Sequence, residues 1–384
     1  MFLRLGLTCF GGPIAHLSYF RAEFVERRRW LSERAYADIV ALSQFLPGPA
    51  SSQTGFAIGL IRGGYMGGLA AWAGFTLPSV ILMLLFAYGA GSIEGSRLGV
   101  GVLHGLKLVA VAIVAQAVLG MARNLCPDRQ RASVAVLSLI LLLLVPGSFS
   151  QIGAILLGGV AGLAFCRGNT EAAPDAAFAT PVSRMAGMIC LAIFFALLGF
   201  SFLPLHAAVA PLFDAFYRSG ALVFGGGHVV LPLLRNAVVV PGWVSDNSFL
   251  SGYGAAQALP GPLFTFAAYL GAVVNVHPSG FLGAGIATLA IFLPGLMAMT
   301  GALPFWHALH GQPAAQAAMR GVNAAVVGLL AAALYNPVWT SAVLKPADLA
   351  VAAGGFVLLI AWRAPPLLVV LLSAAAGAAL AVAA

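Results

Sequence analysis

Long uninterrupted apolar stretches restrict this chain more than any other feature. A helix needs about 20 apolar residues to cross the hydrocarbon core of a bilayer, and many stretches approach that length. The clearest are Met66–Gly91, Leu98–Ala122, Met185–Leu205, Phe281–Leu303, Ala314–Tyr335 and Leu367–Ala384. Their hydrophobicity is continuous and does not alternate, which argues against a β-barrel. Only 8% of the residues are charged, against roughly 25% in ordinary soluble domains, so we expect an all-α polytopic integral membrane protein.

The net charge of +8 comes mostly from arginines at the ends of the apolar stretches. Arginines at such places set the orientation of membrane helices, and no aromatic-rich basic patch indicates nucleic acid as a partner. The four cysteines (Cys9, Cys126, Cys166 and Cys190) have no paired spacing, so neither a metal, another cofactor nor a disulfide is expected. The apolar N-terminus lacks a small-residue cleavage site and belongs to a repeat, so it is not interpreted as a signal peptide.

The chain repeats itself at a spacing of 213 to 216 residues. Phe10-Gly11-Gly12 recurs as Phe224-Gly225-Gly226, and Gln44–Pro49 (QFLPGP) recurs as Gln257–Pro262 (QALPGP). The further matches are Trp30 with Trp243, Leu77-Pro78 with Leu293-Pro294, and Gly105 with Gly321. A nearly constant spacing over all of these markers predicts two homologous halves.

The two halves are expected to have opposite orientations. We predict an N-terminal membrane repeat at residues 1–166, a linker plus an extra transmembrane helix at 167–205, and a C-terminal repeat at 206–384. Arginines cluster after the first motif of the N-terminal repeat, whereas the matching part of the C-terminal repeat has only Arg235. The positive-inside rule therefore places the first set of loops in the cytoplasm and the second set outside. The extra helix supplies the crossing that inverts the second copy, and inverted repeats are typical of secondary transporters.

Glycine and proline motifs interrupt the apolar stretches at matched positions. Each arm beside Pro47-Gly48-Pro49 has about 12 residues, or roughly 18 Å as a helix, which is shorter than the ~30 Å core. Arg27–Arg34 and Arg62 are both expected on the cytoplasmic side, so the stretch between them must turn back as a re-entrant hairpin. The alternative is a single broken crossing, which requires Arg62 to lie outside.

The hairpin tips are expected to form an anion site. Each tip would start a half-helix, and Pro13, Pro49 and Pro262 suit the first helical position. A helix N-terminus carries unpaired N–H groups and about half a positive charge, and glycine lets an oxyanion approach the backbone. Irregular backbone at membrane depth must be covered by protein or line a cavity, so the tips should face one another or a cavity. The expected substrate-binding residues are Gly11, Gly12, Pro13, His16, Gln44, Pro47, Gly48, Pro49, Ser51, Ser52, Gln53, Gly225, Gly226, Gly227, His228, Gln257, Pro260, Gly261, Pro262 and Thr265.

Ionisable residues within the apolar stretches form a second group of candidates. Lys107 lies about nine residues, or roughly 13 Å, into its stretch, and an intramembrane cation indicates function unless it snorkels to the interface. Arg320 is shallower and could snorkel. Asp214 and Arg218 are four residues apart, which favours a mutual ion pair. The two candidate histidines could bind an anion or carry a proton, or could pack at a helix interface with satisfied hydrogen bonds.

Several motifs together resemble the chromate ion transporter family. They are Phe10–His16 (FGGPIAH), Trp30-Leu31-Ser32, Leu46–Gly59 (LPGPASSQTGFAIG) with Gly63, Phe224–Pro232 (FGGGHVVLP) and Leu259–Leu270 (LPGPLFTFAAYL). The resemblance covers nearly the whole chain, and the long members of this family are two-half proteins of this size. It implies a multi-pass protein of the bacterial inner membrane that exports chromate, a sulfate-like dianion, and confers chromate resistance. The N-terminal repeat departs from the C-terminal one, because the apolar helix His206–Phe224 before the second motif is longer than the segment before Phe10. Either the first arm is short or the true start lies upstream of Met1.

Three classes of function remain to be compared. A secondary transporter would bind chromate, or another oxyanion such as sulfate, between the tips. An anion channel would use the same tips to line a continuous pore. An enzyme is not expected, since the sequence contains no HExxH or GxSxG motif and no His/Cys cluster with metal-ligand spacing. The expected partners are the oxyanion and the lipid bilayer, and the sequence leaves open whether the chain forms a homodimer.

Overall fold

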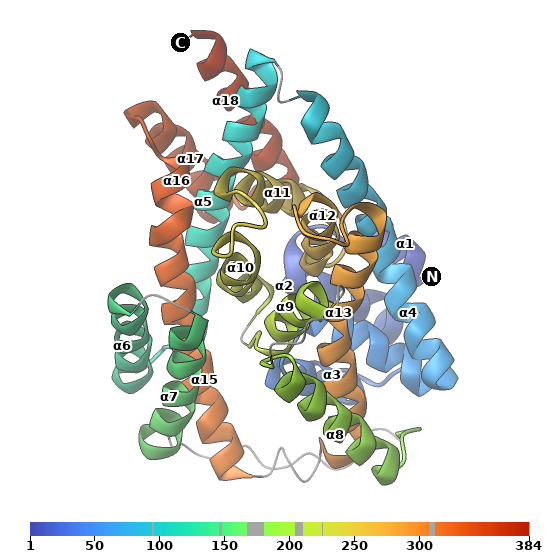
Figure 1. Ribbon diagram of the computed structural model, residues 1–384. Helices are drawn as coiled ribbons and strands as arrows, with labels where there is room; N and C mark the ends of the chain where they lie inside the picture. Colours follow the sequence, from blue (N-terminus) through green and yellow to red (C-terminus); the bar gives the residue numbers. More distant parts are fainter. Residues whose placement is uncertain are drawn as a thin grey trace.

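The computed structural model describes residues 1–93, 96–145, 148–166, 180–203, 210–224, 226–306 and 312–383, and all regular secondary structure in these residues is helical (Figure 1). The helices that are long and apolar enough to cross a membrane are Ala50–Gly89, Arg97–Leu125, Gly280–Phe305 and Pro313–Ala342. Shorter apolar helices pack around them. The prediction of an all-α polytopic membrane protein is confirmed.

The helices follow the order of the two repeats. The N-terminal repeat contains α1 (Phe2–Thr8), α2 (Gly12–Arg21), η1 (Ala22–Arg27), α3 (Glu33–Phe45), α4 (Ala50–Ile93), α5 (Arg97–Leu125), α6 (Arg129–Leu144) and α7 (Ser148–Phe165). Between the repeats lies α8 (Arg184–Phe200). The C-terminal repeat contains α9 (Ala210–Ala221), η2 (Gly227–Val229), α10 (Val230–Leu234), η3 (Arg235–Val239), α11 (Asp246–Ala258), η4 (Leu263–Thr265), α12 (Phe266–Val273), α13 (Gly280–Ala302), η5 (Leu303–Phe305), α15 (Pro313–Ala333), η6 (Leu334–Trp339), α16 (Thr340–Ala342), α17 (Pro346–Ile360) and α18 (Pro366–Ala383).

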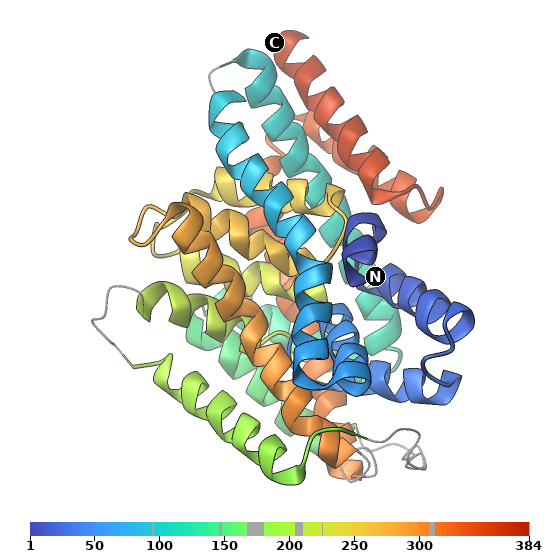
Figure 2. The same ribbon diagram turned by 90° about the vertical axis from the view of Figure 1, so that its right-hand side faces the viewer.

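Matching helices of the two repeats run in opposite directions. The colours of Figure 1 show that the second part of α4 runs upward while α13 runs downward, and that α5 runs downward while α15 runs upward. In Figure 2 the blue helices α2 and α3 lie on the right side of the molecule, and the yellow and orange helices α11 and α12 lie on the left side. The fold therefore contains two repeats of inverted orientation.

Glycines bend each repeat at the same place. The backbone of α4 is not helical at Gly63 and Gly64, so residues 50–62 and the rest of α4 are two segments that pack against each other. A Cβ atom on Gly59 would collide with the backbone oxygen of Gly67. In the C-terminal repeat a Cβ atom on Gly271 would collide in the same way with Gly283, where α12 meets α13. Only glycine permits this close approach of the two backbones.

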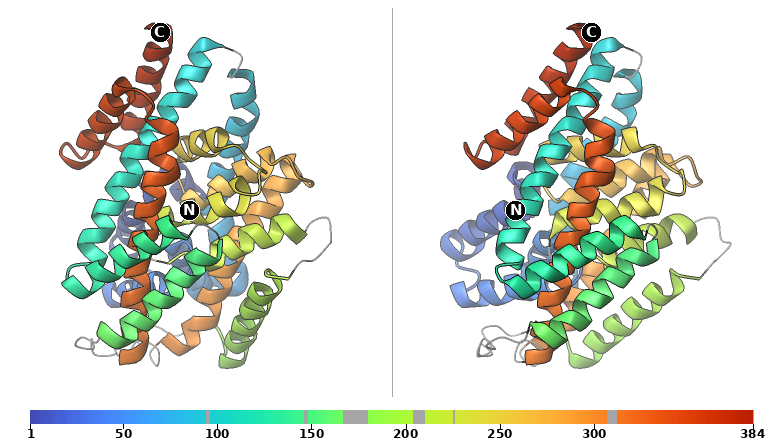
Figure 3. Two further views of the ribbon diagram at one scale, coloured as in Figure 1. Left: turned by 60° about the vertical axis from the view of Figure 1, so that its left-hand side comes forward. Right: turned by 90° about the vertical axis from the view of Figure 1, so that its left-hand side faces the viewer.

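Helices of one repeat pack against helices of the other through stripes of small residues. The long helix α5 packs on α17 and α18 of the other repeat, and α15 packs on α6 and α7 (Figure 3). A Cβ atom on Gly105 would collide with the backbone oxygen of Ser373, and one on Gly321 would collide with Gly158 and Gly162. Such small residues let membrane helices approach closely. Each repeat therefore completes the packing of the other.

Candidate functional site

The two arms of each hairpin begin and end at the same face of the protein. Ser32 and Ser245 cap α3 and α11 by accepting hydrogen bonds from backbone N–H groups, each over 3.1 Å. Trp30, two residues before Ser32, lies under the Arg62 guanidinium. The Cζ atom of Arg62 is 5.1 Å from the centroid of the Trp30 ring. Trp243 accepts a 3.0 Å hydrogen bond from the backbone N–H of Asn275 at the matching place. Because Arg62 lies beside Trp30, the geometry agrees with the re-entrant hairpin and not with a single broken crossing.

Each hairpin tip is bonded to the other repeat. The N–H group of Gly48 donates to the carbonyl oxygen of Val223 over 2.8 Å, and the N–H group of Gly261 donates to that of Cys9 over 2.8 Å. Val223 and Cys9 each directly precede a Phe-Gly-Gly motif. Gly48 and Gly261 have φ values of 121° and 92°, a region that side chains strongly disfavour. The Pro-Gly-Pro tips and the Phe-Gly-Gly motifs are therefore paired crosswise between the repeats.

The four motifs gather in one region of the molecule. A Cβ atom on Gly227 would lie 3.4 Å from Pro13 and 4.0 Å from Leu263, so the second Phe-Gly-Gly motif lies beside both the first one and the second Pro-Gly-Pro tip. Helix α2 starts at Gly12 with Gly11 as its N-cap. Pro13 is the second residue of its helix and not the first, and Pro49 and Pro262 each stand one residue before the first helical residue. Gly225 lies outside the described residues.

A cavity of about 90 Å³ lies where these motifs meet. We call it the tip cavity, and it has room for several water molecules. The predicted site residues that line it are Gly11, Gly12, His228, Gln257 and Gly261. The Nε2 atom of Gln257 is buried and has no hydrogen-bond partner within the described part of the chain. His228 uses Nδ1 in a 2.8 Å hydrogen bond with the Tyr253 hydroxyl, which leaves Nε2 as its second polar atom.

The tip cavity also contains groups that the sequence reasoning did not select. Gln116 of α5 and Pro366 at the start of α18 both line it. Gln116 is an amide within an otherwise apolar stretch, so a search for uncharged polar residues in these stretches would have found it. Pro366 carries no comparable signal in the sequence, because its place depends on the packing of α18 against α5.

The first Pro-Gly-Pro tip is packed closely against the other repeat. The Nε2 atom of Gln53 donates to the carbonyl oxygens of Pro47 (2.9 Å) and Gly295 (3.0 Å). A Cβ atom on Gly48 would lie 2.8 Å from the Cα atom of Gly295. The hydroxyls of Ser43 and Thr54 are 2.9 Å apart and join the two arms. Gln53 therefore fastens this tip, and its amide donors are already used.

The other predicted residues near the tips do not line the tip cavity. Ser51 and Ser52 are buried in the first turn of α4, and Gln44 is exposed. The Thr265 hydroxyl donates to the Pro262 carbonyl over 2.8 Å and thus stabilises the local turn. The buried His16 ring packs edge-on against Phe75, with 5.4 Å between centroids. Pro47, Pro49, Pro260, Gly226 and Gly227 shape the backbone at the tips.

The ionisable candidates lie away from the tip cavity. The Nζ atom of Lys107 donates to Asn247 at the start of α11 over 3.0 Å. Arg320 donates to the Cys166 carbonyl over 3.0 Å and so caps the end of α7, which agrees with a structural role. Asp214 and Arg218 interact electrostatically, but the described residues show no direct salt bridge between them, because the Arg218 guanidinium donates to the Ser201 carbonyl. The described residues contain no group of three or more His, Cys, Asp or Glu that could hold a metal ion.

Comparisons with known proteins show which family the chain resembles in sequence. A family model described as chromate transporter matches residues 1–163 and 210–378. A chromate transport protein of Pseudomonas aeruginosa is 30% identical over 388 residues, which cover 94% of this chain and 86% of that protein. A chromate transport protein of Cupriavidus metallidurans is 26% identical and covers 87% and 80%. An uncharacterized transporter of Methanocaldococcus jannaschii is 25% identical and covers 86% and 81%. No solved structure matches the chain.

Proposed function

The chain belongs to the chromate transporter family, and from this premise we propose that it is a secondary transporter that exports chromate across the bacterial inner membrane. Its family members are transporters and not enzymes. Chromate is a tetrahedral dianion that resembles sulfate, so the site must bind a doubly charged oxyanion and release it again. The tip cavity is the observation that supports this proposal.

The tip cavity offers hydrogen-bond donors without a full positive charge. Helix α2 starts at its wall, and a partly buried helix N-terminus stabilises an anion by at most ~2 kcal/mol. The Gln257 Nε2 group lacks a partner within the described residues, and an oxyanion would accept its hydrogen bonds. Gln116 and His228 add polar groups on two further walls. A bound ion must also leave, and neutral donors hold a dianion less tightly than arginine would.

The crosswise pairing of the tips suggests how an ion could reach one site from either side of the membrane. The bonds from Gly48 to Val223 and from Gly261 to Cys9 join opposite repeats. In proteins with inverted repeats, alternating access is largely a rocking of one repeat against the other around a fixed site. We propose that these bonds keep the tips together during the rocking, while the access routes on the two sides open in turn.

Uptake of labelled chromate into everted membrane vesicles tests this proposal. We expect saturable uptake that exceeds uptake by vesicles without the protein, that responds to an imposed proton or counter-anion gradient, and that sulfate inhibits if it shares the site. Equal uptake by both kinds of vesicle would refute transport of chromate. Steady single-channel currents in a planar bilayer would instead show an anion channel.

A further inference from the structure

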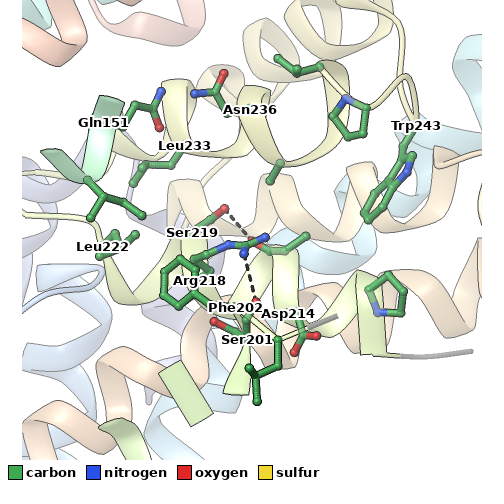
Figure 4. A pocket seen from close by; sticks show the side chains of 17 residues that line it. Gln151, Ser201, Phe202, Asp214, Arg218, Ser219, Leu222, Leu233, Asn236 and Trp243 are labelled. Atoms are coloured by element: carbon green, nitrogen blue, oxygen red, sulfur yellow. Dashed lines mark hydrogen bonds between the residues drawn. The ribbon is translucent and has the colours of Figure 1, made fainter. Parts of the chain in front are cut away.

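A second and larger cavity lies beside the tips, between α9, η3, the start of α7 and the end of α8 (Figure 4). Its volume is about 550 Å³. An adjoining cavity of about 430 Å³ shares Gln151, Asn236 and Val240 with it and also contains Arg235. We call the two together the vestibule. None of the residues predicted from the sequence as substrate-binding lines it.

The vestibule has a mostly apolar lining that includes a group of polar side chains which water or an ion can solvate. Gln151, Asp214, Arg218, Ser219 and Asn236 all border the larger cavity. Ionisable side chains among membrane helices are costly and almost always face a bundle interior or a water-filled space. The two amides, the hydroxyl and the two ionisable groups therefore favour water in this part of the vestibule.

Arg218 is the feature of the vestibule that selects for anions. One of its nitrogens donates to the Ser201 carbonyl over 3.0 Å, and its guanidinium lies 5.1 Å from the centroid of the Phe202 ring. These contacts position the group, which has five N–H donors in all. Figure 4 shows its side chain in the middle of the cavity, with the amides of Gln151 and Asn236 on the facing wall. Asp214 lines the same cavity and interacts electrostatically with Arg218, but among the described residues the hydrogen bond of the guanidinium goes to Ser201 and not to a carboxylate.

The other arginine of the vestibule provides a contrast. Arg235 donates two hydrogen bonds, of 3.1 and 3.4 Å, to the carboxylate of Asp246. Its charge is therefore compensated by a direct ion pair, whereas Arg218 interacts with the carboxylate of Asp214 only through space and keeps N–H donors that a dissolved ion could accept from. Arginine is well suited to oxyanions because its planar fork can donate two parallel hydrogen bonds.

The vestibule ends close to the tip cavity. Its inner wall contains Leu222, and the next residue, Val223, accepts the hydrogen bond from the Gly48 tip. Asn236 lies eight positions after His228 on the continuous helical run of η2, α10 and η3, which is about 12 Å along the helix axis. His228 of the tip cavity and Asn236 of the vestibule are therefore about two helical turns apart.

The inverted repeat places an arginine at the matching position of the other half. Arg218 stands six residues before Phe224, and Arg4 stands six residues before Phe10. Arg4 is exposed on α1. Since the repeats have opposite orientations, the two arginines belong to opposite sides of the tips.

We propose that the vestibule is a second binding site for a tetrahedral oxyanion, in which Arg218, Gln151 and Asn236 hold the ion on the way to or from the tip cavity. This inference rests on the proposed function in taking the transported ion as its ligand. The vestibule opens where α8 ends and where Trp243 starts the second hairpin. The charge bias of the loops assigns this face to the outside, so for an exporter the vestibule is the exit site.

Chromate binding to the purified protein tests the site. Chromate absorbs light in the region where tryptophan emits, so an ion in the vestibule should quench Trp243, and the Trp243→Phe variant should lose that part of the quenching. We expect Arg218→Gln to raise the Kd by tenfold or more, because it removes charge-assisted hydrogen bonds. Arg218→Lys keeps the charge but loses the planar fork, so its Kd should lie between those of the wild type and Arg218→Gln. The matched control is Arg123→Gln, which removes the same charge from the exposed end of α5 and should leave the Kd unchanged.

Two outcomes of the binding test would overturn the proposal. One is an unchanged Kd for Arg218→Gln. The other is displacement of chromate by anionic lipid but not by sulfate, which would assign the vestibule to a lipid headgroup. If the Arg218→Gln effect is present while wild-type vesicles take up no chromate, the proposed function fails and the binding site stands.

A labelling experiment tests access to the vestibule without relying on binding. In a variant whose four native cysteines are replaced by serine, Asn236→Cys should react with a negatively charged, membrane-impermeant thiol reagent applied to spheroplasts. Sulfate should slow the reaction. Leu156→Cys is the control, since this residue is 65% exposed on α7 but lines neither cavity of the vestibule, and we expect it to stay unlabelled. Absence of labelling at Asn236→Cys would refute a water-filled vestibule that is open to the outside.

Discussion

The two Pro-Gly-Pro tips share one backbone design but differ in the chemistry around it. Gly48 and Gly261 both donate to the carbonyl that precedes the opposite Phe-Gly-Gly motif. At the first tip Gln53 fills the space and bonds to the other repeat through Gly295. At the second tip Ser79, which matches Gly295 in the repeat, donates to the Pro260 carbonyl over 2.6 Å, and the tip cavity remains beside it. Duplication has thus kept the scaffold in both halves, while the described residues place the tip cavity beside the second tip and fill the surroundings of the first with Gln53.

The largest expected effect comes from adding a methyl group at either tip. In Gly261→Ala the new Cβ atom would collide with the Ser79 hydroxyl, and in Gly48→Ala it would lie 2.8 Å from the Cα atom of Gly295. Both positions also have φ values that alanine rarely adopts. We expect chromate uptake to fall at least 100-fold in both variants, together with a lower melting temperature. Gly153→Ala is the control, because a Cβ atom there meets nothing within 4 Å. Normal uptake in Gly261→Ala would contradict the packing of this tip.

Replacing each of the two matched glutamines by leucine compares the functions of the two tips most directly. Gln257 lines the tip cavity, whereas Gln44, its counterpart, is exposed and does not. Loss of an uncharged donor to an ion costs about 1.5–3 kcal/mol, so Gln257→Leu should raise the KM for chromate by roughly tenfold to 100-fold. Gln44→Leu should change it by less than about threefold. Equal effects of the two substitutions would show that both tips bind the ion and that the difference between them is not functional.

Gln53→Leu tests whether the first tip is a structural joint. The substitution removes the hydrogen bonds to the carbonyls of Pro47 and Gly295 and leaves these two acceptors without that donor. We expect the protein to lose about 1–3 kcal/mol of stability, measured as a lower melting temperature in detergent. The KM for chromate should remain within about twofold of the wild type. A large rise in KM at unchanged stability would instead make Gln53 a residue that binds the ion.

Local features of this fold could be predicted from the sequence, because local chemistry produces them. Glycine at positive φ acts over a few residues, so the tips could be predicted at both matched places. The serine N-caps of α3 and α11 are equally local, but they became evident only in the structure. The partners of the tips could not be predicted. The bond from Gly261 to Cys9 spans the two repeats, and no periodicity in the sequence encodes which carbonyl a distant amide will meet.

Side-chain roles were harder to predict than the backbone, for the same reason. The spacing of Asp214 and Arg218 favours an ion pair on a helix, but the end of α8 brings the Ser201 carbonyl and the Phe202 ring to Arg218 instead. Lys107 and Arg320 are cations in apolar stretches, and both find partners on neighbouring helices. The depth of a charge within a stretch does not show what a neighbouring helix offers to it.

The smallest expected effect comes from the base of each hairpin, which is the place where its first and second arms meet. The two repeats use different residues to join the arms there. Arg62 lies over Trp30 in the first repeat, and Asn275 bonds to the Trp243 carbonyl in the second. Arg62→Asn copies the second repeat into the first and removes a cation–π contact worth about 0.5–1 kcal/mol at an exposed site. We expect a slightly lower melting temperature and chromate uptake within about twofold of the wild type, because the base lies far from the tip cavity. If uptake fell tenfold at normal stability, the base of the first hairpin would belong to the ion pathway, and the contrast between a structural first hairpin and a functional second one would no longer hold.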